Sequence, residues 1–317
     1  MERSLRAGRL ATFVYFALNG FLMGMWVVHI PAVEHHVGIG HAVLGWLLLL
    51  LGGSAFAGMQ VIGPLTDRFG ARAVVPASAA LCSVAVVLPG LATNAWMLGT
   101  ALLVLGFGNG CLDVSMNAHA VQVERGYRRP VMSAFHASFS LGGVLAALVG
   151  ARTLSWGWSP AVTLGAVALL GLAGAALAAP ALLRPERAHT AEAPAAVVKP
   201  QRRTPRRIWV LAALALMLML CEGVANDWSV LHLRDVLDAP AATAALAYGA
   251  FSTAMTVGRL LADRVAARFG PVAIVRYGAS VAALGLAFGG TLPLDPPRLG
   301  RVGGVRGRDV RLRPAAL

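Results

Sequence analysis

Long apolar segments separated by short loops run along most of the chain. A helix needs about 20 apolar residues to cross a membrane, because each residue rises about 1.5 Å through a hydrocarbon core about 30 Å thick. Five segments reach or approach this length without a single Asp, Glu, Lys or Arg: 11–33, 42–66, 131–151, 153–183 and 239–258. Each is predicted to form a membrane-spanning helix.

The remaining apolar segments add four more helices. They are 73–112, which is long enough for two helices split by a turn at 89–94, and the segments 208–231 and 272–292. The pattern therefore predicts an all-α fold, a polytopic transmembrane bundle of nine helices.

The composition agrees with a membrane protein. Hydrophobic residues make up 57 % of the chain, charged residues 13 %, and the mean hydropathy is +0.69, whereas a soluble domain carries about 25 % charged residues. The net charge of +13 does not indicate a nucleic-acid binder, because Lys and Arg lie in short runs between apolar segments. Cys82, Cys111 and Cys221 lie within apolar segments without metal-ligand spacing, so neither a metal site nor a cofactor is predicted.

The basic residues alternate between the loops. They precede the first helix and follow the second, fourth, sixth and eighth, whereas loops 34–41 and 89–95 contain none. Because Lys and Arg accumulate on the cytoplasmic side, the N-terminus is predicted to be cytoplasmic and the chain to lie in a bacterial cytoplasmic (inner) membrane.

Four regions follow from this pattern. They are a six-helix bundle (1–183), a cytoplasmic linker (184–207), an incomplete three-helix bundle (208–292) and a basic tail (293–317). The tail contains six Arg although the helix count places it outside the cytoplasm, against the charge rule. It is predicted to be disordered and to arise from a premature or shifted reading frame.

A short motif recurs after the second and the eighth helix. The first copy contains Gly63, Asp67, Arg68, Gly70 and Arg72, and the second, which begins at Gly258, 195 residues later, contains Asp263 and Arg264. The motif resembles the signature loop of the major facilitator superfamily, close to G-x-L-x-D-R-x-G-x-R. The resemblance implies loops that latch the two halves of a transporter on the cytoplasmic side; a basic turn with an incidental Asp is the alternative.

Other stretches narrow the resemblance. Residues 108–117, 135–140 and 222–228, together with Asn19-Gly20-Phe21, are similar to the fucose-permease-like bacterial members of the superfamily. Members have twelve helices, so the resemblance implies that this chain, with about nine, is truncated at its C-terminus. Asn19 stands where fucose permeases rely on an acid, which argues against fucose as the solute.

Polar residues within the apolar segments mark a candidate solute and proton site. Asn109, Asp113 and Asn117 are spaced i, i+4, i+8 and so share one helix face. An ionised Asp facing lipid costs at least about 2.5 kcal/mol, so this face is predicted to line a water-accessible cavity. The full candidate set is Asn19, Asn109, Asp113, Asn117, His136, Glu222, Asn226 and Asp227.

Each candidate also has a purely structural interpretation. Asp113 is predicted to couple transport or contact the solute, or else to be hydrogen-bonded for helix packing. His136 either relays protons with Asp113 or is a satisfied buried histidine. The asparagines either line the cavity or bond between helices, and Asp227 is expected to be half solvated near the outer end of its helix.

The function predicted from these features is secondary active transport of a small solute by alternating access. The solute is predicted to be a sugar-like or other polar metabolite. No G-x-x-x-x-G-K-[ST] motif is present, so nucleotide is not expected to drive transport, and protons are the predicted coupling ion because Asp113, Glu222 and His136 can titrate. An enzyme is not predicted, since neither H-E-x-x-H nor G-x-S-x-G occurs. The alternative is a truncated or sensor-like membrane protein that transports nothing.

Overall fold

A computed structural model describes residues 2–127, 131–183 and 206–291. All regular structure in these ranges is helical. The order is α1 (Glu2–Val37), α2 (His41–Phe69), α3 (Ala71–Ala85), α4 (Leu88–Leu91), α5 (Ala95–Tyr127), α6 (Met132–Ser155), α7 (Pro160–Ala178), η1 (Ala179–Ala181), α8 (Arg206–Leu231), η2 (His232–Val236), α9 (Ala241–Phe269) and α10 (Pro271–Thr291). The predicted tail, and the predicted linker up to residue 205, lie outside the described residues.

The predicted fold class is confirmed. Nine helices of 15 residues or more occur in the described ranges, at the positions expected from the apolar segments. Seven segments of the described chain are long and apolar enough to cross a membrane. The spans predicted for α9 and α10 stay predictions: the charge-free part of α9 is rich in small and hydroxyl residues, and the apolar part of α10 is shorter.

One predicted helix boundary is wrong. The segment 153–183 was expected to be one helix, but α6 continues to Ser155 and α7 begins only at Pro160. Gly157 turns the chain with φ +72°, a conformation that favours glycine. The Ser159 side chain then accepts the Val162 N–H and caps α7, with Pro160 at its first position.

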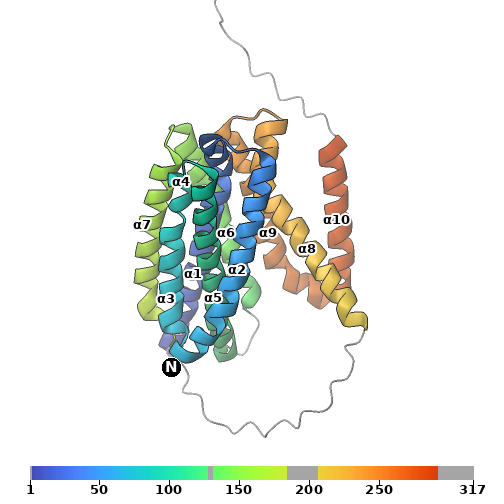
Figure 1. The fold of residues 1–317 in the computed structure, drawn as a ribbon. Coiled ribbons are helices and arrows are strands. Elements are labelled where there is room, and N and C mark those ends of the chain that lie inside the picture. Colours follow the sequence, from blue (N-terminus) through green and yellow to red (C-terminus); the bar gives the residue numbers. More distant parts are fainter. Residues whose placement is uncertain (1, 128–130, 184–205, 292–317) are drawn as a thin grey trace, which may run out of the picture.

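Helices α1, α2, α3, α5, α6 and α7 form the first half of the molecule (Figure 1). In this half α1 packs against α5, α6 and α7, and α2 packs against α5. Tyr15, Phe16 and Trp26 of α1 are fully buried with Phe135 of α6. A single core cluster therefore links most of these helices through α1.

Two of the helix contacts depend on glycine. A Cβ built on Gly20 of α1 would lie 1.9 Å from the Phe139 carbonyl oxygen of α6, and one on Gly110 of α5 would lie 2.0 Å from the Ala55 oxygen of α2. Any larger residue would push the backbones apart. Such close crossings on small residues drive helix association where water is absent.

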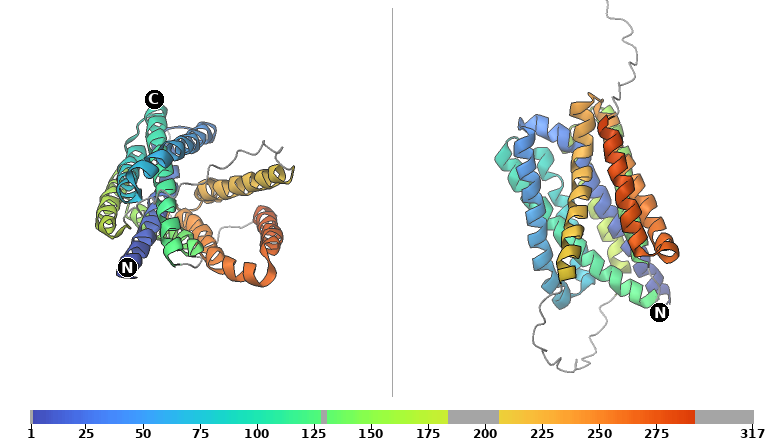
Figure 2. Two further views of the ribbon diagram at one scale, coloured as in Figure 1. Left: turned by 90° about the horizontal axis from the view of Figure 1, so that it is seen from below. Right: turned by 90° about the vertical axis from the view of Figure 1, so that its right-hand side faces the viewer.

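The second half meets the first mainly through α9, which lies along α6. Helix α8 contacts α9 and α1, and α10 packs on α9. Figure 2 shows α8 and α10 standing away from the first half, with α9 between α6 and α10. The interface between the two halves is therefore built chiefly from α6, α9 and the inner side of α8.

The structure also shows how the repeated motif relates the halves. Helices α2 and α9 both contain 29 residues, and each ends in Arg-Phe-Gly with the glycine at a positive φ of 79° or 82°. The two helices start and end 200 residues apart, not 195 as the glycines Gly63 and Gly258 indicated. Asp263 therefore corresponds to Gly63 rather than to Asp67, which has no acidic counterpart in α9.

Candidate functional site

Arg259 of α9 joins the two halves through a polar network. Its Nη1 donates to the Ser140 Oγ and, at 3.3 Å, to the backbone oxygen of His136, both on α6. Its Nη2 donates to Glu222 Oε1 of α8 at 3.1 Å. One guanidinium thus ties a helix of the first half to two helices of the second.

The network is explained by the position of Arg259 inside an apolar helix bundle. A charged side chain in a membrane is costly and must find partners, and the guanidinium offers five N–H donors but no acceptor. Glu222 neutralises the charge while Ser140 and the His136 carbonyl satisfy further donors. The side chains of Arg259 and Glu222 are only 24 % and 35 % exposed.

Sequence reasoning found Glu222 and His136 but missed Arg259. The residue follows Gly258 and was taken as part of the predicted cytoplasmic loop, whereas α9 continues for ten residues beyond it. The missed signal was a single Arg between Gly258 and Leu260 in an apolar stretch. An Arg in a predicted span calls for an acidic partner.

The polar face predicted on α5 is present. Asn117 Nδ2 donates to the Asp113 backbone oxygen at 2.9 Å and to its Oδ1 at 3.2 Å. Asp113 interacts electrostatically with His136 across the α5–α6 contact. Within the described residues no hydrogen bond joins the two side chains, so the predicted relay is not formed in this conformation.

His136 is held in a defined orientation. Its Nδ1 lies 3.1 Å from the Met132 backbone oxygen, and because a carbonyl can only accept, this nitrogen donates. The neutral ring then keeps Nε2 as its proton acceptor. The ring packs edge-on against Phe16, with centroids 5.2 Å apart.

The carboxamide oxygens of Asn19 and Asn109 lack partners. Both atoms are buried without a hydrogen bond to any described residue. Leaving a buried acceptor unsatisfied costs about 1–3 kcal/mol. Both oxygens therefore keep an unused capacity to accept a hydrogen bond.

Asn226 and Asp227 form a separate group on α8. Asn226 Nδ2 donates to Asp227 Oδ1 at 2.8 Å, and both residues are partly buried. Asp227 interacts electrostatically with Tyr248 of α9. Within the described residues no hydrogen bond links this pair to the Arg259 network.

The residues of the predicted gating loops lie at the ends of the paired helices. Asp67 and Arg68 are exposed in the last turn of α2, and Gly63 and Arg72 are partly buried. Arg68 stacks over Phe69, as Arg268 does over Phe269, at 5.4 Å from each ring centroid. Gly70 forms the turn into α3, whereas Asp263 and the exposed Arg264 lie within α9. Within the described residues Asp67 has no hydrogen-bond or ion-pair partner, so a latch at this residue stays a prediction.

Comparison with known proteins identifies the family. Residues 10–299 match the Major Facilitator Superfamily. An uncharacterised transporter, y4wD, of Sinorhizobium fredii is 36 % identical over 288 residues, which cover 88 % of this chain and 74 % of that protein. An uncharacterised MFS-type transporter of Yersinia pestis is 33 % identical over 282 residues, 88 % of this chain and 71 % of its own. The crystal structure of the nucleoside transporter NupG shares the fold, with a TM-score of 0.59 at 14 % identity over 84 % of this chain and 68 % of NupG. The chain belongs to the major facilitator superfamily.

Proposed function

We propose that this chain is a secondary active transporter that moves a small polar solute across a membrane by alternating access. The observation that carries the proposal is the Arg259 network, because one charged group contacts both halves where they meet. Rocking of the halves requires contacts at their interface that can break and re-form. The hydrogen bonds from the Arg259 guanidinium to Ser140 and to the His136 carbonyl of the first half are such contacts, and the ion pair with Glu222 holds the guanidinium in place.

Protons are the coupling ion in this proposal. Protonation of Glu222 removes the negative charge that neutralises Arg259 and so weakens the bond between α8 and α9. Asp113 and His136 lie beside the same interface and can exchange a proton once they move into contact. Proton binding at Glu222 would thereby leave the Arg259 guanidinium free to change its hydrogen bonds to α6, which join the two halves.

The solute is proposed to carry several hydroxyl or amine donors. The unpaired oxygens of Asn19 and Asn109 are acceptors in the first half, and each matched donor would recover part of the cost of burying them. Sugars and nucleosides fit this description. Membership of the fucose-permease-like branch stays a prediction, as does the placement in a bacterial inner membrane with a cytoplasmic N-terminus.

Uptake by the purified chain in proteoliposomes tests the proposal. With an imposed pH gradient and a panel of labelled sugars, nucleosides and organic acids, we expect accumulation of at least one solute, abolished by a protonophore. Asp113→Asn should lower gradient-driven accumulation at least about fivefold, in line with typical coupling free energies. Exchange of solute without a gradient should persist.

Asp238→Asn is the matched control. Asp238 is exposed and has a positive φ of 49°, which Asn tolerates, so accumulation should be unchanged. Equal accumulation by the wild type and Asp113→Asn would reduce Asp113 to a packing residue. A wild-type chain that binds a solute and moves none would contradict transport and favour a sensor.

A further inference from the structure

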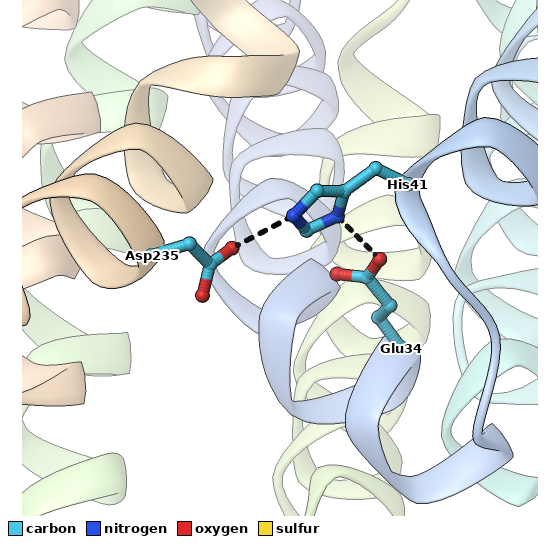
Figure 3. A group of neighbouring side chains, drawn as sticks. All are labelled: Glu34, His41 and Asp235. Carbon is cyan, nitrogen blue, oxygen red and sulfur yellow. Dashed lines mark hydrogen bonds and ion pairs between the residues drawn. The ribbon is translucent and has the colours of Figure 1, made fainter.

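A histidine lies between two carboxylates where the ends of the two halves meet. His41, the first residue of α2, places Nδ1 2.7 Å from Glu34 Oε1 of α1 and Nε2 3.5 Å from Asp235 Oδ2 of η2. Figure 3 shows the imidazole ring pointing at both acids. One donor atom from each residue lies within 4.8 Å of the others. We refer to these three residues as the end site.

The backbone on the first-half side is shaped to form this arrangement. After Glu34 the chain turns back at Gly38, whose φ is +73°, and the amides of Gly38 and Ile39 both donate to the Glu34 carbonyl, at 3.0 and 3.3 Å. This tight turn returns the chain so that His41 meets the Glu34 side chain. The carboxylate is mostly buried, with 9 % of the side chain exposed.

The second-half side uses an irregular turn. Asp235 lies in η2, a single π-helical turn between α8 and α9. Such turns are rare and are frequently found at functional sites, because they re-aim side chains. Asp235 reaches His41 from this turn, about 200 residues away in sequence.

The chemistry of the donors matches a transition-metal ion. Imidazole nitrogen and carboxylate oxygen are both ligand types of Zn²⁺, whereas Mg²⁺ and Ca²⁺ prefer oxygen ligands alone. A cavity of about 600 Å³ opens onto the site and gives an ion access. Arg234 also lines this cavity, but two carboxylates against one guanidinium still leave a negative charge.

We propose that the end site binds one divalent transition-metal ion, with zinc as its probe, and that the ion ties the two halves together. Glu34, Asp235 and one ring nitrogen of His41 supply three ligands, and water completes the tetrahedron. The metal takes the place of the proton on the ring nitrogen that it binds, so binding to a protonated ring releases that proton. This site departs from the sequence analysis, which predicted no metal. It does not depend on transport activity.

Calorimetric titration of the purified full chain, without a polyhistidine tag, tests metal binding. With ZnCl₂ we expect one site per chain. His41→Gln and Asp235→Asn should each weaken zinc binding by more than about 100-fold. Loss of a group that only supports a metal ligand already weakens binding by about 10- to 100-fold, and these residues are proposed as ligands themselves. Excess MgCl₂ should not compete.

His36→Gln is the matched control, because His36 is exposed in the last turn of α1 and outside the end site. Its zinc affinity should equal that of the wild type. Equal affinity in His41→Gln, provided its thermal unfolding is unchanged, would overturn the site, and so would competition by Mg²⁺. Zinc should also stabilise the contact between the two halves, which is measured as a higher unfolding temperature in the wild type but not in Asp235→Asn. Zinc binding without this increase would contradict the proposed tie between the halves.

Discussion

Replacing Arg259 by Gln is expected to destabilise the folded protein by about 1–3 kcal/mol, because it leaves the Glu222 carboxylate without its cation in the helix bundle. Breaking a fully buried ion pair from one side costs about 3–5 kcal/mol. Glu222 and Arg259 are partly exposed, which lowers the expected cost. Thermal unfolding in detergent, followed by circular dichroism, measures the effect as a lower unfolding temperature.

A double-mutant cycle separates the ion pair from simple loss of packing. Glu222→Gln together with Arg259→Gln removes both charges, so the pair should be more stable than Arg259→Gln alone. Arg276→Gln, an exposed arginine of α10, serves as the control and should leave stability within about 0.5 kcal/mol. Strict additivity of the two single substitutions would show that Arg259 and Glu222 do not act together.

Gly110→Ala is expected to have an effect of similar size through packing. A Cβ on Gly110 would lie 2.0 Å from the Ala55 carbonyl oxygen and 2.9 Å from its Cα, so α2 and α5 must separate. Overpacking of this kind costs about 1–3 kcal/mol. The measurement is the yield of monodisperse protein and its unfolding temperature after purification.

Gly99→Ala provides the comparison on the same helix. A Cβ at Gly99 would meet two side-chain atoms, Leu47 Cδ2 at 3.4 Å and Leu50 Cδ2 at 3.9 Å, both ordinary contacts. Alanine is also the better helix former by about 1 kcal/mol. This variant should be as stable as the wild type or more so. If both substitutions gave the same stability, the close crossing of α2 and α5 would not be a determinant of the fold.

The helices were predictable because lipid imposes a simple rule on them. A charge-free apolar segment of sufficient length must form a helix in a membrane, where every backbone group needs an internal partner. The boundary between α6 and α7 was missed because Trp156, Gly157 and Trp158 are as free of charge as the helices around them. A turn without a polar signal is not visible in hydropathy.

The candidate site was predictable only where its residues share a helix. The spacing of Asp113 and Asn117 predicted that they share one face of the helix, and on that face the structure shows a hydrogen bond between them. Arg259 could not be paired with Glu222 from sequence, because the partners lie on different helices. The same holds for His41 and Asp235, which come together only when the two halves are assembled.

The counterpart of Asp67 was misassigned for a related reason. Aligning the repeated motif at its first glycines, with one extra residue before the second Asp, placed Asp263 with Asp67, whereas the equal lengths of α2 and α9 place it with Gly63. A short motif can be matched at several offsets. The Arg-Phe-Gly turns define the ends of both helices, and aligning these ends gives the correct offset of 200 residues.

Labelling of a single cysteine at position 109 from each side of the membrane tests alternating access most directly. In a background with Cys82, Cys111 and Cys221 replaced by serine, Asn109→Cys places the thiol on the proposed cavity face of α5. An impermeant maleimide should reach it from either side, with a pH gradient raising the rate on one side and lowering it on the other. Thr93→Cys, exposed in the turn before α5, should react from one side only. Reaction of the position-109 thiol from a single side, unaffected by the gradient, would contradict alternating access between the two halves.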